Sequence, residues 1–130
     1  MKKRAPKILV CITSQLNSRR LITFAHSLSE NEQGEFHILH VKRGNNILDN
    51  EESLELLQEL FSFGSELGGV INALCADDVL STIISFVKRE KITTMVLGEP
   101  SADKIEQSEE LIEKLREKLP LVEIAVLARE

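Results

Sequence analysis

The chain has 130 residues, the size of one ordinary globular domain, and 42% of them are hydrophobic, which is enough to build a layered core. Its formal net charge of -5 at pH 7 excludes a typical nucleic-acid-binding protein, because phosphate groups require a basic face. No apolar stretch is long enough for a membrane-spanning helix or a signal-peptide core. We therefore expect one cytoplasmic domain over residues 1–130, with no nucleic-acid partner and no membrane insertion.

The two cysteines, Cys11 and Cys75, each lie within an apolar run. They form neither a Cys-x-x-Cys pair nor a spacing typical of metal ligands. A cysteine in an apolar run usually behaves as a small, buried hydrophobic residue. We therefore expect both thiols to be buried and reduced, which is consistent with a cytoplasmic protein.

Residues 7–12 form a short, continuous apolar run, which is typical of a strand covered on both faces. After a polar segment, apolar residues recur at helical spacing over residues 21–28. Asn17 or Ser18 is the predicted N-cap of this first helix, because their side-chain oxygens accept hydrogen bonds from free backbone N–H groups.

The middle of the chain continues this alternation of strands and helices. Residues 36–41 predict a second strand, and residues 51–67 carry an apolar stripe that predicts a second helix. Gly68 and Gly69 mark the end of that helix. Residues 70–75 then predict a third strand.

The last third of the chain predicts two more helices and two more strands. Asp77 or Asp78 caps the third helix, and residues 93–98 form the fourth strand. Asp103 starts the fourth helix, and residues 121–128 form the fifth strand. The helical residues predicted to face the core are Leu21, Ile22, Ala25, Leu28, Leu54, Leu57, Leu60, Phe61, Val79, Leu80, Ile83, Ile84, Val87, Ile105, Leu111, Ile112, Leu115 and Leu119.

This order of elements, βαβαβαβαβ, predicts an α/β fold of the Rossmann-like type. Right-handed crossovers force a five-stranded parallel sheet with strand order 3-2-1-4-5 and helices on both faces. In such a sheet, ligands bind beyond the carboxyl ends of the strands where the winding direction reverses, which here lies between the first and fourth strands. The segments after Ile12 and Leu97 therefore form a candidate crevice.

The first of these segments is rich in hydroxyl and amide side chains and leads into two arginines. Arg19 and Arg20 stand in the first helical turn, where they oppose the positive end of the helix dipole. A bound anion would remove this conflict and accept hydrogen bonds from the free backbone N–H groups. Two exposed arginines on a solvated face are the alternative interpretation.

The second segment gives mixed signals for a nucleotide. Gly98 permits a close backbone approach, whereas Glu99 and Asp103 put carboxylates where a triphosphate would lie. The candidate ligand-binding residues of the whole crevice are Thr13, Ser14, Asn17, Arg19, Arg20, Gly98, Glu99 and Ser101.

We identify no assembled catalytic or metal site in the sequence. His37 and His40 are three apart on a strand, so they face opposite sides of the sheet and cannot share a metal ion. Asp77 and Asp78 follow the third strand, where a phosphorelay receiver keeps its phosphoacceptor, but the acidic pair that a receiver needs after its first strand is missing. Neither a P-loop nor a dinucleotide fingerprint follows any strand.

Two stretches carry a family resemblance. Residues 8–11 and 18–22, ILVC and SRRLI, resemble the opening of the universal stress protein (UspA-like) superfamily. Residues 77–100, DDVLSTIISFVKREKITTMVLGEP, are similar to the third helix and fourth strand of the stress-protein-like domain in KdpD-type osmosensitive potassium sensor histidine kinases. The resemblance covers residues 7–128, nearly the whole chain.

The resemblance implies a non-catalytic sensing or regulatory domain in potassium, osmotic or general stress signalling. It implies other domains of a sensor kinase as partners, with any kinase activity outside this chain. It also implies a homodimer through the last strand, residues Leu121 to Ala128.

One branch of the superfamily binds ATP with an Asp after the first strand and a motif GxxGxxxxxxxxxG[ST] after the fourth. Here Thr13 and Ser14 stand near the Asp position, Ser101 replaces the second glycine and Leu111 stands at the third, so that only Gly98 remains. This departure argues against ATP binding in the familiar mode.

Some potassium-sensor members instead bind cyclic di-AMP through paired serines and an aromatic motif on the second strand. Residues 13–15 and 36–40 stand at those places, with Phe36 matching and His40 replacing the terminal Tyr. Three hypotheses follow from the resemblance. They are a sensing module, a protein that binds an adenine nucleotide (ATP or AMP, including a slow ATPase) or a cyclic dinucleotide, and a ligand-free interaction module.

Overall fold

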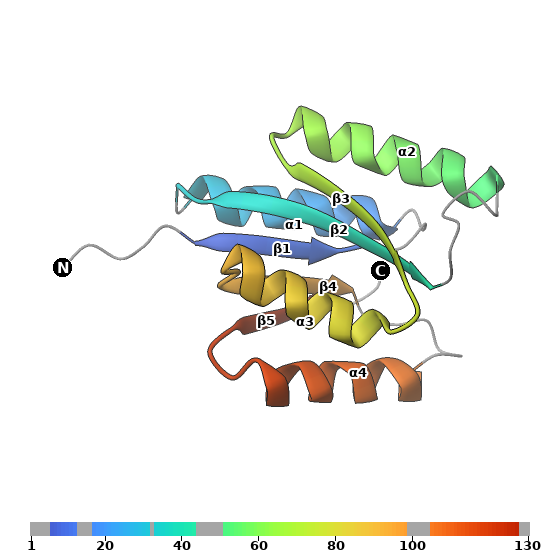
Figure 1. Cartoon of the computed structure of the whole chain (residues 1–130). Helices are drawn as coiled ribbons and strands as arrows, with labels where there is room; N and C mark the ends of the chain where they lie inside the picture. The colour runs from blue at the N-terminus through green and yellow to red at the C-terminus, as the bar shows by residue number, and fades with distance from the viewer. Residues whose placement is uncertain (1–5, 13–16, 32, 44–50, 99–104, 128–130) are drawn as a thin grey trace.

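The computed structural model describes residues 6–12, 17–31, 33–43, 51–98 and 105–127. Strands and helices alternate along these residues, as the apolar periodicity predicts (Figure 1). The elements are β1 (Lys7–Cys11), α1 (Asn17–Asn31), β2 (Glu35–Arg43), α2 (Glu51–Glu66), β3 (Val70–Ala76), α3 (Val79–Glu90), β4 (Thr94–Gly98), α4 (Ile105–Lys118) and β5 (Glu123–Leu127).

The strands form one parallel sheet in the order β3-β2-β1-β4-β5, which confirms the predicted topology. Helices α1 and α2 cover one face, and α3 and α4 cover the other (Figure 1). β1 lies at the centre between β2 and β4, so the chain builds one half of the sheet outward and then returns to build the other half.

Burial along β1 explains why its apolar run is continuous rather than alternating. Ile8 and Val10 belong to the core under α1 and α2, whereas Leu9 belongs to the core under α3 and α4. All three side chains are buried. A central strand with both faces covered requires an apolar residue at every position.

Both ends of α3 are closed by local hydrogen bonds. Asp78 is the N-cap, and its Oδ1 accepts a hydrogen bond from the backbone N–H of Ser81 at 3.1 Å. Lys91 ends the helix in the left-handed conformation, and a backbone N–H at this cap donates to the carbonyl oxygen of Val87. The structure thus selects Asp78 over its neighbour as the cap. The predicted cap of α4, Asp103, lies outside the described residues.

The glycine pair predicted to stop α2 does so. The helix ends at Glu66, and Gly68 adopts a φ of +90°, which a residue with a side chain rarely tolerates. The N–H of Gly69 donates to the carbonyl oxygen of Gly64 at 2.9 Å. This bond satisfies one of the carbonyls left open at the helix end.

The last strand is shorter than the predicted range of residues 121–128. Pairing with β4 begins where the N–H of Glu123 donates to the carbonyl oxygen of Thr93, and Leu121 lies in the preceding turn with 96% of its surface exposed. The N–H of Val122 donates to the carbonyl oxygen of Leu119 and closes that turn. The apolar run at residues 121–128 does not show that its first two residues, Leu121 and Val122, belong to this turn.

The prediction for the two thiols is correct only in part. Both cysteines are free, but Cys75 is exposed. It lies near the end of the outer strand β3, where only one neighbouring strand is present. Cys11 packs against the core under α3 and α4, in agreement with the prediction.

No helix within the described ranges is both long enough and apolar enough to cross a membrane.

Candidate functional site

The winding direction of the sheet reverses between β1 and β4, so their carboxyl ends define the candidate crevice. β1 ends at Cys11, and the N–H of Ile12 still donates to the carbonyl oxygen of Leu39 on β2 at 2.9 Å. β4 ends at Gly98, which pairs with Leu127 of β5. Helix α1 contacts both β1 and β4, and its N-terminus follows the loop that leaves β1.

The structure describes half of the predicted site residues. Gly98 is the last residue of β4, as the sequence predicts. α1 already begins at Asn17, so Asn17 and Ser18 lie inside the helix and neither is its N-cap, contrary to the prediction. Arg19 and Arg20 lie in the first turn of α1. The residues that lie outside the described part of the chain are Thr13, Ser14, Glu99 and Ser101.

The two arginines have different surroundings. The guanidinium carbon of Arg19 lies 4.3 Å from the centroid of the Phe63 ring on α2, in cation–π geometry. Arg19 is exposed, but this contact holds it across the α1–α2 interface. Arg20 is partly buried and engaged in an interaction. Of the two, Arg20 is the less exposed side chain.

The N-terminus of α1 has the electrostatic character of an anion site. Its first turn contains no acidic residue. The first backbone N–H groups of a helix have no partner within the helix, and the dipole makes this end positive. Ser18 is buried in this turn. A phosphate or carboxylate placed here would meet N–H donors and no competing carboxylate from the helix itself.

His40 lies beside the end of β1, a position that its sequence pattern did not indicate. Its Nδ1 lies 2.9 Å from the carbonyl oxygen of Ile12. Because a carbonyl oxygen can only accept, Nδ1 carries the proton in this bond, and Nε2 of the neutral ring is an acceptor. The parallel register, in which Leu39 is level with Cys11, puts His40 just beyond the end of β1.

His37 lies on the other face of the sheet from His40. Its ring meets the Phe86 ring of α3 edge-on, with centroids 6.0 Å apart. The side chain is only 6% exposed, and neither ring nitrogen has a hydrogen-bond partner. His37 is therefore a core residue and not part of the crevice.

The described residues offer little for catalysis or metal binding. No group of three His, Cys, Asp or Glu side chains among them is arranged to hold a metal ion. At the end of β1, burial raises the pKa of the Cys11 thiol to about 12. A thiol with this pKa stays protonated at neutral pH and is a poor nucleophile.

Comparison with known proteins agrees with this architecture. No protein-family model matches the sequence, and no curated protein matches it. A universal stress protein from Archaeoglobus fulgidus is similar in structure, with 17% sequence identity and a TM-score of 0.67 over 96% of this chain and 93% of that one. The predicted resemblance is therefore confirmed at the level of the fold, which is that of the universal stress proteins.

Two similar solved structures contain a nucleotide. The Archaeoglobus fulgidus universal stress protein in complex with dAMP has 16% identity and a TM-score of 0.66, over 98% of each chain. A universal stress protein in complex with cAMP has 12% identity and a TM-score of 0.63, over 96% of each chain.

Proposed function

We propose that this chain is a non-catalytic regulatory domain that responds to an adenine nucleotide with a single or cyclic phosphate. Two observations near the end of β1 carry the proposal. The first turn of α1 contains no acidic residue, and the Nδ1 of His40 lies 2.9 Å from the Ile12 carbonyl oxygen, which leaves Nε2 of the neutral ring as an acceptor. The dAMP and cAMP complexes of proteins with this fold support the choice of ligand class.

In the proposed complex, the phosphate binds at the N-terminus of α1. The backbone N–H groups of the first turn donate to it, and Arg20 adds positive charge. The adenine amino group is a hydrogen-bond donor, and the His40 Nε2 is a matching acceptor. The hydroxyls of Thr13, Ser14 and Ser101 and the backbone at Gly98 complete the proposed binding set.

A triphosphate is the weaker candidate. The position of the third glycine in the ATP motif holds Leu111, whose side chain packs against the core under α3 and α4. It therefore contributes to the hydrophobic core instead of a flexible phosphate-binding loop. Gly98 remains, but a single glycine leaves little room for the protein backbone to surround a triphosphate.

The proposal extends to the signalling context. The similarity of residues 77–100 to KdpD-type sensor kinases supports a role in potassium or osmotic signalling in the cytoplasm. In that role, ligand binding at the crevice changes the contacts that the domain makes with the other domains of a kinase. Potassium uptake measured in cells that carry crevice variants tests this part separately from ligand binding.

The ligand is tested by thermal shift and calorimetry with AMP, cAMP, ATP and cyclic di-AMP, and with GMP as the base control. We expect AMP or cAMP to stabilise the chain by about 2.7 kcal/mol at a hundred times its dissociation constant. We expect His40→Ala to weaken binding about tenfold through loss of the acceptor, and Arg20→Ala to weaken it further.

His26→Ala is the matched control. His26 lies on α1 and is partly buried, and its Nε2 contacts Glu30 at 3.3 Å, away from the end of β1. Binding that is equally strong in the His40 and Arg20 variants contradicts the site. Absence of any shift with all five nucleotides contradicts the proposed function and favours the ligand-free interaction module.

A further inference from the structure

A second concave surface lies on the opposite side of the sheet from α1 and α2. It is a groove of about 220 Å³ between α3 and β3. Helix α3 packs on the inner strands through Ile83, Phe86 and Val87, so the outermost strand is left only partly covered and Leu74 is half-buried. The lining residues are Leu74, Ser81, Thr82, Ser85, Phe86 and Arg89.

The outer edge of β3 is open. This strand pairs with β2 on one side, and no described strand lies on the other. Its seven residues, VINALCA, include no charged residue and no proline, and Val70 is 47% exposed. Natural sheets usually protect an outer strand with charges, proline or a bulge, because its free backbone groups accept another strand.

The ends of the groove have opposite hydrogen-bonding character. At the start of α3, the Ser81 hydroxyl donates to Asp78 Oδ2 and the Thr82 hydroxyl donates to the Asp78 carbonyl oxygen, so their oxygens are left as acceptors. At the end of α3, the Arg89 guanidinium lies over the Phe86 ring at 5.4 Å. Its side chain is 66% exposed.

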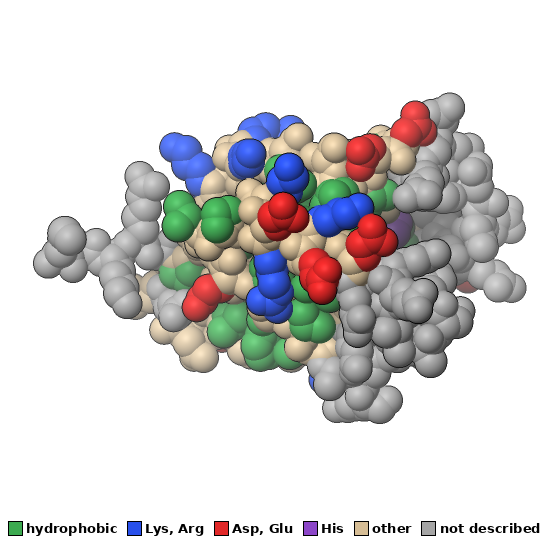
Figure 2. All heavy atoms as spheres, turned by 90° about the horizontal axis from the view of Figure 1, so that it is seen from below, with side chains coloured by type: hydrophobic (Ala, Val, Ile, Leu, Met, Phe, Trp, Pro, Cys, Tyr) green, Lys and Arg blue, Asp and Glu red, His purple; other side chains and the backbone are tan. Residues whose placement is uncertain are grey.

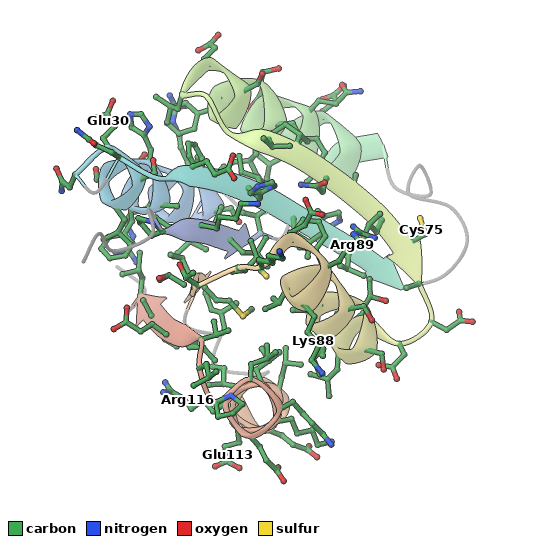
Figure 3. The ribbon with its side chains drawn as sticks, turned by 60° about the vertical axis from the view of Figure 1, so that its left-hand side comes forward. Glu30, Cys75, Lys88, Arg89, Glu113 and Arg116 are labelled. Atoms are coloured by element: carbon green, nitrogen blue, oxygen red, sulfur yellow. The ribbon has the colours of Figure 1, made fainter. Side chains whose placement is uncertain are left out.

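Arg89 is the charged side chain of the groove. In Figure 3 it lies on the side of α3 that faces β3, whereas Lys88 lies on the opposite side of the helix. The Nε of Arg89 forms an exposed ion pair with Glu90 Oε2 at 3.4 Å, so a partner carboxylate would share Arg89 with Glu90. The guanidinium has five N–H donors, and a carboxylate can take two of them in a bidentate pair.

We propose that this groove binds an extended segment of a partner protein that carries an acidic side chain. The segment adds to the outer edge of β3 through its backbone, its apolar side chains contact the half-buried Leu74, and its carboxylate pairs with Arg89. Polar side chains of the segment donate to the serine and threonine oxygens at the start of α3.

The charges favour this occupant over two others. A small phosphate would gain only Arg89 and would meet acceptor oxygens and the Asp78 carboxylate at the far end of the groove. A second copy that adds through its own β3 would bring a strand without a charged residue, so a carboxylate for Arg89 would have to come from outside residues 70–76.

The test is selection of a phage-displayed library of random heptapeptides on the full chain. We expect enriched peptides to alternate β-branched and polar residues around one Asp or Glu, and to protect the amides of β3 from hydrogen exchange. Arg89→Glu is expected to weaken their binding at least about tenfold. Lys88→Glu is the control, because it makes the same change in charge on the other side of the same helical turn.

Three results would overturn the proposal. The first is that no peptide is enriched, or that enriched peptides bind the Arg89 and Lys88 variants equally well. The second is that inorganic phosphate produces the same protection of β3 as the peptide. The third is that the Ala73→Cys variant forms a disulfide between two copies, which would show that β3 pairs with β3 of a second copy. The nucleotide experiments concern another face, so either proposal can fail without the other.

Discussion

At the scale of single residues, two histidines on one strand have opposite energetic roles. His37 is buried with two unpartnered ring nitrogens, whereas His40 donates a hydrogen bond to the Ile12 carbonyl oxygen. We expect His37→Leu to raise the free energy of unfolding by about 1 kcal/mol, because an unsatisfied buried polar group is removed. We expect His40→Leu to lower it by about 1 kcal/mol, because a bonded carbonyl oxygen loses its donor.

Urea denaturation at pH 8 measures both values under one condition. Both variants replace His by Leu on the same strand. Effects of strand propensity and side-chain size therefore largely cancel when their free energies of unfolding are compared. A loss of stability in His37→Leu as large as that in His40→Leu would show that the buried ring is stabilised by contacts that outweigh its unsatisfied nitrogens.

The Cys11 thiol predicts a dependence of stability on alkaline pH. Burial raises its pKa from 9.0 to about 12 in the folded chain. Above pH 9 the unfolded chain therefore releases a proton that the folded chain keeps. Because the unfolded state then binds fewer protons, this group lowers stability by up to roughly 1.4 kcal/mol per pH unit until about pH 12.

The Cys11→Ala variant has no thiol at this position, so its free energy of unfolding does not fall for this reason as pH rises. We therefore expect the difference in stability between wild type and Cys11→Ala to become smaller between pH 9 and pH 11. Guanidinium denaturation across that range measures the difference. Cys75→Ala is the matched control, because it makes the same substitution at the exposed thiol. The absence of tyrosine from the chain simplifies the comparison. A parallel pH profile for Cys11→Ala and wild type would contradict the assignment.

At the scale of elements, the start of α3 depends on one side chain. Asp78 accepts hydrogen bonds from both the backbone N–H and the hydroxyl of Ser81. We expect Asp78→Ala to lower the free energy of unfolding by about 1 kcal/mol, the usual effect of removing an N-cap. Asp77→Ala removes the same charge one residue earlier and is expected to change stability by less than about 0.5 kcal/mol. Thermal unfolding measures both, and equal losses would contradict the capping role.

The order and type of the elements could be predicted because each depends on local pattern. The continuous apolar run of β1 reflects a strand that is covered on both faces. The helical spacing of apolar residues in α3 reflects a helix with one buried face. The exposure of Cys75 could not be predicted in the same way, because it depends on β3 being an outer strand that is only partly covered. His40 is similar, since its role depends on the register that sets it beside the end of β1.

The candidate crevice illustrates the same limit at the level of the site. Its position follows from strand order alone, and the sequence predicts that order from the alternation of strands and helices. The orientation of Arg19 toward Phe63 depends on how α1 packs on α2, which no local pattern encodes. Sequence therefore predicts the position of the crevice better than it predicts the side-chain contacts around it.

At the scale of the whole molecule, the outer strand β5 is the candidate surface for self-association. Figure 2 shows a face on which acidic and basic side chains are interspersed with hydrophobic ones. Ion pairs such as Lys114 with Glu110 on α4, at 3.1 Å, stay solvated and contribute little to stability. The outer strand β5, by contrast, carries Val126 with 37% of its surface exposed.

We propose that two copies of the chain pair antiparallel through β5, which would give the free backbone groups of that strand a partner. Light scattering after gel filtration is then expected to give twice the 14.6 kDa of one chain. Val126→Lys places a charge in the pairing strand and is expected to give a monomer. Val70→Lys makes the same change on the exposed edge of β3 and is expected to leave the dimer intact. A monomeric wild type at every concentration, or a dimer that only Val70→Lys disrupts, would rule out pairing through β5.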